Sequence, residues 1–170
     1  MSNEVFEAER TLMAVREYQD KPIPKDVLRR IVEAAHLTAS AGNRQPWHFV
    51  LVDDRDRLRK LGSLVRTGPD TANAAAAVIV AYEKESHAAV SDASRAIQSM
   101  MLAAWGEGVG SNWTGFMGID AVRAEFGIPA SYDVLAVVPF GYPKRKVIGK
   151  KKRKPFNDVV SWERFGMPLA

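Results

Sequence analysis

Residues 40–49, with the sequence SAGNRQPWHF, combine small side chains, two carboxamides, a proline and aromatic rings. Gly42 permits a positive φ, and Ser40 and Asn43 can turn their side chains onto nearby backbone. The carboxamides of Asn43 and Gln45 can hydrogen-bond the edge of a planar ligand, and the small side chains leave room for its face. The proline after Gln45 predicts an extended backbone there. On this stretch alone, a ligand-binding loop and an ordinary connecting turn are equally good interpretations.

A second candidate group is a run of cations near the carboxyl terminus. Residues 144–154 hold eight of the chain's 24 lysines and arginines, so without them the net charge of +4 would become negative. Lys151 and Arg153 are two residues apart, and an extended backbone would place both on one side, where they suit a terminal phosphate. Arg16 is a candidate third cation. A solvated surface and nucleic-acid binding are the alternatives, although the run lacks aromatic residues to stack on bases.

Other kinds of catalytic site find little support in the sequence. There is no cysteine, which excludes disulfides, a thiolate nucleophile and Cys-type metal sites. The three histidines stand apart at spacings that do not suit a metal, and no serine lies in a nucleophile-elbow pattern. Three glycines alternate over residues 106–110, but they follow a helical pattern, so they indicate a helix end and not a dinucleotide fingerprint. We therefore expect no metal and no catalytic side chain.

The elements that must position these groups alternate along the chain. Its 170 residues, 46% hydrophobic and 26% charged, predict one soluble domain over residues 1–170 with a substantial core. Periodicity gives either an α/β or an α+β fold. The longest helical pattern has a broad apolar face, which suits either a dimer core or an intramolecular one. Helices are expected over residues 5–17, 27–37, 54–65, 91–108 and 120–126, strands over 47–52, 74–81 and 134–138, and a short strand or loop over 112–116.

The amino terminus lacks the basic and then apolar pattern of a secretory signal. The most apolar run, residues 96–104, is too short to span a bilayer and contains polar residues. Together with the absence of cysteine, these features predict a cytoplasmic protein that does not enter a membrane.

Taken in order, four motifs resemble the nitroreductase family of FMN-dependent oxidoreductases over nearly the whole chain. They are VREY and PIP at 15–18 and 22–24, SAGNRQPW at 40–47, AIQSMMLAA and GVGS at 96–104 and 108–111, and GYP with K-x-R-x-P at 141–143 and 151–155. The resemblance implies an α+β sandwich in which helices flank a central, mostly antiparallel sheet. It also implies an intertwined homodimer with two FMN sites at the subunit interface.

The resemblance further implies roles for individual residues. The family commonly has Arg-Arg-Ser where this chain has Leu12, Met13 and Ala14, so Arg10 is a candidate substitute. Arg66 is the nearest candidate for the basic residue that faces flavin N1 and O2. The implied cofactor contacts are Arg16, Lys151 and Arg153 on the phosphate; Ala39, Ser40, Ala41 and Asn43 on the ring and ribityl chain, supported by Gln45; and backbone N–H groups of Thr114 and Gly115 near N5.

The activity that the resemblance implies is hydride transfer from NADH or NADPH, through flavin N5, to an electron-poor acceptor such as a nitroaromatic or quinone, in ping-pong order. The flavin carries this chemistry, so no protein nucleophile is needed. The expected partners are a small-molecule acceptor and a second copy of the chain, without nucleic acid. The alternatives are a non-catalytic flavin- or deazaflavin-binding protein and, ranked last, a nucleic-acid-binding domain.

Overall fold

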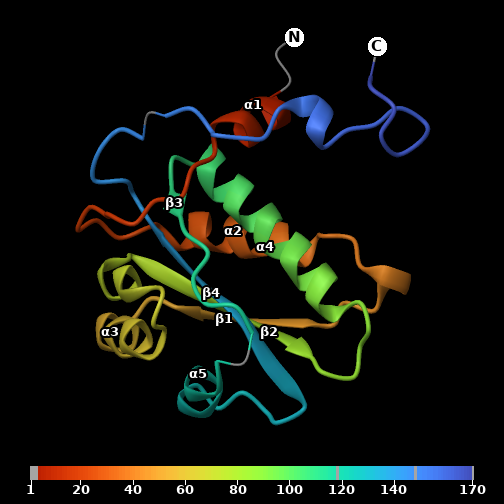
Figure 1. The fold of residues 1–170 in the computed structure, drawn as a ribbon. Helices are drawn as coiled ribbons and strands as arrows, with labels where there is room; N and C mark the ends of the chain where they lie inside the picture. Colours follow the sequence, from red (N-terminus) through yellow and green to blue (C-terminus); the bar gives the residue numbers. More distant parts are fainter. Residues whose placement is uncertain (1–3, 118, 148, 170) are drawn as a thin grey trace.

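The computed structural model describes residues 4–117, 119–147 and 149–169 and shows an α+β fold (Figure 1). The α-helices are α1 (Glu4–Thr11), α2 (Lys25–His36), α3 (Arg55–Leu64), α4 (Ala89–Gly106) and α5 (Asp120–Glu125). The strands are β1 (Trp47–Val52), β2 (Ala76–Glu83), β3 (Gly110–Ser111) and β4 (Tyr132–Gly141). Short 3₁₀ helices are η1 (Ala41–Asn43), η2 (Pro69–Asn73) and η3 (Phe156–Asp158).

The strands form an antiparallel sheet in the order β1-β2-β4-β3. Trp47 at the start of β1 lies opposite Tyr82, and Tyr82 lies opposite Asp133 on β4. At the other end of β2, Ala76 lies opposite Phe140. The sheet therefore has two ends, which we call the Tyr82 end and the Phe140 end. This arrangement confirms the predicted mostly antiparallel sheet.

Helices cover both faces of the sheet because successive residues of a strand point to opposite faces. All of β2 except Glu83 is buried, so both of its faces are apolar. One face packs against α2 and α4 through Ala76, Val78 and Val80, and the other packs against α3 and α5 through Ala77, Ile79 and Ala81. Figure 1 shows α2 and α4 above the sheet and α5 below it. The result is the predicted sandwich.

Helix α4 runs the length of the sheet. It follows β2 and so begins at the Tyr82 end, and after it the chain enters β3, which pairs with β4 at Gly141. Its 18 residues correspond to roughly 27 Å at 1.5 Å per residue. Segments held at the two ends of α4 are therefore well separated within one chain.

No helix in the described ranges is long and apolar enough to cross a membrane.

The structure corrects the predicted extent of the first helix. Helix α1 ends at Thr11 and does not continue to residue 17. The segment that follows pairs with β3 instead, since Ala14 forms a parallel bridge with Ser111 and the Val15 N–H donates to the Ser111 carbonyl at 2.9 Å. Arg16 consequently lies on an extended segment beside the Phe140 end of the sheet.

The close approach of this segment to β3 depends on Gly110. A Cβ atom there would lie 2.5 Å from Val15 Cγ2. We predict that Gly110→Ala lowers the free energy of unfolding by about 1–3 kcal/mol, since Val15 or its backbone must shift. Gly106→Ala is the matched control, because a Cβ there meets nothing within 4 Å. Urea denaturation measures both; equal stability of the two variants would contradict the close packing.

Candidate functional site

The loop before β1 has an unusual backbone. We call residues 40–45 the amide loop. Gly42, Asn43 and Gln45 have φ values of 58°, 54° and 51°, all in the left-handed region. The extended conformation predicted at Gln45 is therefore wrong. Its N–H donates to Ser40 Oγ at 2.9 Å and its carbonyl accepts from the Trp47 N–H at 2.8 Å, so hydrogen bonds close the bend.

Most of the amide loop is exposed to solvent. Ala41, Asn43 and Gln45 are exposed, as is Ala39 just before the loop, and Ser40 is half-buried. Gln45 Nε2 donates to the Asn43 carbonyl at 3.1 Å, which links the two carboxamide residues. Left-handed conformations at residues other than glycine cost about 1–2 kcal/mol each, although Asn tolerates them best. An exposed loop with this backbone therefore needs hydrogen bonds to hold it.

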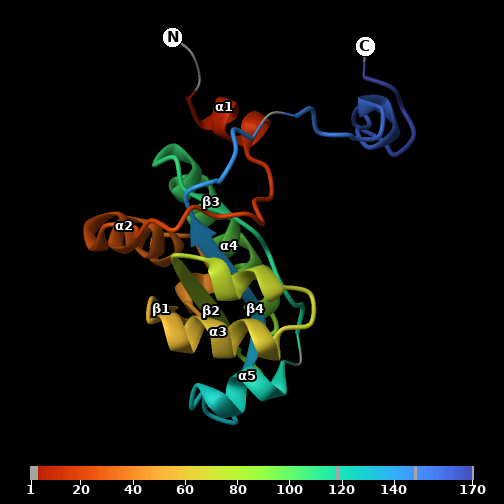
Figure 2. The same cartoon turned by 90° about the vertical axis from the view of Figure 1, so that its left-hand side faces the viewer.

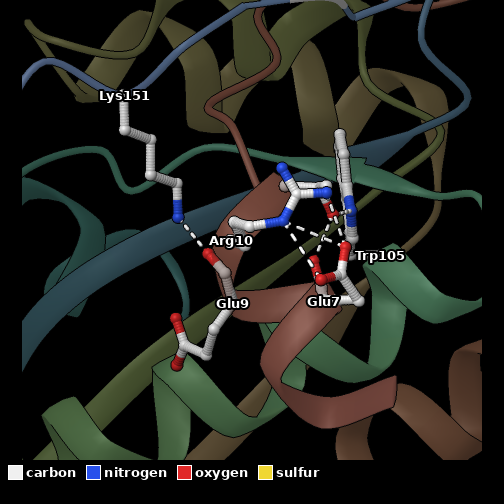
Figure 3. A network of polar contacts seen from close by, with 6 residues as sticks. Glu7, Glu9, Arg10, Trp105 and Lys151 are labelled. Atoms are coloured by element: carbon white, nitrogen blue, oxygen red, sulfur yellow. Dashed lines mark hydrogen bonds and ion pairs between the residues drawn. The ribbon is translucent and has the colours of Figure 1, made fainter. Parts of the chain in front are cut away.

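The predicted cationic contacts lie on the amino-terminal segment and on the carboxyl-terminal run. We call Arg10, Arg16, Lys151 and Arg153 the cationic end. Figure 3 shows Lys151 Nζ donating to the Glu9 carbonyl beside Arg10. Arg10 itself pairs with Glu7, one turn earlier on α1. The structure thus brings Arg10 and Lys151 together, although they are far apart in the sequence.

Arg16 and Arg153 are the other two predicted phosphate contacts. Arg16 lines two hollows of about 320 Å³ and 460 Å³; Arg145 and Lys146 share the first, and Lys144 shares the second. Arg153 is exposed, and its Nη1 donates to the Lys152 carbonyl at 3.0 Å. Guanidinium and ammonium groups in such numbers suit a phosphate.

Tyr18 fixes the segment that carries Arg16. Its hydroxyl donates to the Val15 carbonyl at 2.7 Å, and its ring is buried. Burial, and then the Asp70 carboxylate, raise the pKa of Tyr18 well above its ordinary value. The phenol therefore stays protonated and keeps donating at any physiological pH.

The structure changes the interpretation of Thr114. Its N–H and its hydroxyl both donate to the Val137 carbonyl, at 2.9 and 2.7 Å. The Thr114 N–H that was predicted to lie near flavin N5 is therefore already bonded to β4 in this structure. The Gly115 N–H donates to Thr67 Oγ1 at 2.8 Å, beside Arg66. Thr67 is exposed and Thr114 is buried, so the Gly115 N–H is better placed than the Thr114 N–H to bind a ligand.

The amide loop and the segments of the cationic end contact α4 at different positions. The Ala41 N–H donates to Asp92 near the start of α4, whereas Trp105 near its end donates to Thr11 Oγ1 beside Arg10. Trp105 lies 13 positions after Asp92, which is about 20 Å along the helix axis. Gln98, which donates to Glu9 beside Arg10, lies closer, six positions after Asp92. Of the hollows described here, none is lined by both groups. The largest, of about 620 Å³ between α2 and β1, contains none of the predicted residues.

The chain matches a known family over most of its length. Residues 12–89 and 69–142 match the family model described as the nitroreductase family. The chain belongs to the nitroreductase family. It is therefore an oxidoreductase, and the predicted family and fold are confirmed.

Individual relatives match most of the chain. An Archaeoglobus fulgidus protein, provisionally named NADH dehydrogenase/NAD(P)H nitroreductase, is 37% identical over 143 residues, covering 79% of this chain and 82% of its own. A provisionally named nitroreductase of Desulfovibrio desulfuricans, solved in complex with FMN, has a TM-score of 0.84 at 26% identity and covers 97% and 99% of the two chains. An FMN-dependent nitroreductase of Clostridium difficile has a TM-score of 0.86 at 25% identity, covering 93% and 98%.

One polar residue that contacts the amide loop was not predicted from the sequence. Asp92 is fully buried on the helical pattern that was interpreted as apolar. It lies four residues before Ala96 and eight before Met100, so it shares their face of the helix. An ionisable residue on an apolar helical face is a signal that could have identified it.

The left-handed backbone at Asn43 gives a testable prediction. A β-branched side chain tolerates this conformation poorly, so we expect Asn43→Val to lower the free energy of unfolding by about 1–2 kcal/mol. Asn43→Gly keeps the conformation available and should stay within about 0.5 kcal/mol of the parent. Urea denaturation of both variants measures the difference. Equal loss in the two variants would show that the backbone at Asn43 is not what limits the substitution.

Proposed function

We propose that this nitroreductase-family protein binds FMN and passes hydride from NADH or NADPH to an electron-poor acceptor such as a nitroaromatic or quinone. Family membership and the FMN complex of the Desulfovibrio desulfuricans relative support the cofactor. The name of the Archaeoglobus fulgidus relative supports the reductant. We take residues 1–170 as a single flavin-binding domain of a cytoplasmic protein that binds no nucleic acid.

The donors present in the chain fit FMN. The positions of the family's usual Arg-Arg-Ser hold Leu12, which is buried, and Met13, which is half-buried, so these side chains serve packing. The cations come instead from the flanking Arg16 and from the carboxyl-terminal run. Lys151 gives one N–H to Glu9 and has two left for a phosphate. The exposed carboxamides of the amide loop suit the polar edge of an isoalloxazine ring.

One observation guides how these donors could bind a single ligand: none of the hollows described above is lined by both the amide loop and the cationic end of one chain. We infer that each site takes its amide loop from one copy and its cationic end from a second copy. A two-fold axis would generate two such sites, because every contact across it occurs twice.

The carboxyl-terminal segment supports a second copy. Figure 2 shows it standing apart from the helices that cover the sheet. Its apolar side chains are exposed, with Phe156 at 62%, Trp162 at 58% and Phe165 at 101% of full exposure. Large aromatic side chains in water are costly, and a contiguous group of them marks an interaction site. A partner chain would bury them.

In this site the chain's own residues bind and orient. Arg16, Lys151 and Arg153 would hold the phosphate by charge-assisted hydrogen bonds. Asn43 and Gln45 would fix the ring edge, and the Gly115 N–H would turn from Thr67 to the ring. When bound, FMN supplies the hydride chemistry, and no general base of the chain is required. The small side chains of Ala39 and Ala41 leave space for a nicotinamide and then an acceptor to occupy the same face in turn.

Absorption spectroscopy tests the proposal. We predict that the protein, purified or supplied with FMN, holds flavin equimolar with the chain and shows its yellow absorption. Without air, NADH or NADPH should bleach that absorption, and a quinone should restore it. A bound flavin that neither cofactor bleaches would favour the non-catalytic carrier instead. A colourless protein that does not take up FMN would contradict the proposal.

A further inference from the structure

Asp92 is a buried carboxylate that the proposed chemistry does not use. Its side chain is 1% exposed and lies on α4 among the alanines of the core. A buried charge is costly unless hydrogen bonds and an opposite charge compensate it. Both are present: Oδ2 accepts from the Ala41 N–H at 3.0 Å, and Oδ1 accepts from Arg95 Nη2. The contact with Ala41 joins residues 51 positions apart in the sequence.

The position of Asp92 near the start of a helix does not explain its burial. A carboxylate in the first turns of a helix is favourable, but an exposed one gains the same benefit without the cost of desolvation. What burial adds is rigidity, since α4 packs through Ala93, Ala96 and Ile97, all without exposed surface. A hydrogen bond from this helix therefore holds its partner to a fixed frame.

The partner that it holds is the amide loop. Three left-handed residues follow Ala41 within four positions, and most of them have their side chains in solvent. A second contact with α4 lies just before the loop, where Thr38 Oγ1 donates to Ser99 Oγ at 2.8 Å. Asp92 provides the contact within the loop itself, at Ala41, which lies two residues before Asn43.

We propose that Asp92 is a positioning residue for the flavin ring: through the Ala41 N–H, and compensated by Arg95, it fixes the amide loop in the conformation that presents Asn43 and Gln45. The inference rests on the proposed function for its ligand. Asp92 does not touch the ligand. Its loss should therefore weaken binding of the ring by disordering the loop, and should leave the contribution of the phosphate unchanged.

Titration with two ligands separates these contributions. Riboflavin has the ring without the phosphate, so the ratio of its Kd to that of FMN reports the phosphate contacts. We expect Asp92→Ala to raise both Kd values by about tenfold, as loss of a charged hydrogen bond would, and to leave their ratio unchanged. Arg153→Ala should raise the Kd of FMN alone. Ser94→Ala is the matched control on α4, because its hydroxyl donates only to the Val90 carbonyl of its own helix.

Asp92→Asn keeps an acceptor oxygen and should show a smaller but equal rise for both ligands, of about threefold. It serves as the test if Asp92→Ala does not fold. Unchanged Kd values in both folded variants, or a rise for FMN alone, would overturn the proposal.

Limited tryptic digestion reads the loop without any ligand. Arg44 is exposed within the loop, so the rate of cleavage after it reports loop order. We expect cleavage to be faster in the Asp92 variants than in the parent and Ser94→Ala. An unchanged rate of cleavage would overturn the positioning role, whether or not the parent binds flavin. A parent that binds neither FMN nor riboflavin would contradict only the proposed function.

Discussion

The length of α4 is the constraint on which the proposed site depends. The helix holds the amide loop through Asp92 near one end and contacts Thr11, next to Arg10, through Trp105 near the other. Because it packs along the sheet through side chains without exposed surface, it holds these contacts at fixed positions. We propose that a flavin bound by both groups lies between two chains. The exposed aromatic residues of the carboxyl-terminal segment are consistent with the same conclusion.

Much of the fold could be predicted from the sequence because its signals are local. The apolar run of β2 indicates a strand buried on both faces, and the apolar face of α4 indicates a helix in the core. The residue types of the amide loop likewise predicted a tight bend that carries two carboxamides. The cations at Lys151 and Arg153 pointed to an anion. These features depend on residues close together in the chain.

The remaining features depend on contacts between distant segments. The end of α1 is set by pairing with Ser111, and the fate of the Thr114 N–H is set by β4. The backbone at Gln45 follows a hydrogen bond to Ser40, which overrides the usual preference before proline. Nothing in the local sequence shows where the amide loop and the cationic end lie relative to each other.

Mixed dimers test the central claim most directly. Two differently tagged chains, one with Asn43→Ala and one with Arg153→Ala, are produced together and the mixed dimer is isolated. If each site combines the amide loop of one chain with the cationic end of the other, one site of the mixed dimer is intact and the other carries both changes. The account predicts that it binds half as much FMN as the parent, at a concentration where either variant alone is nearly empty. A mixed dimer as empty as the two variants, or no dimer at all, would contradict it.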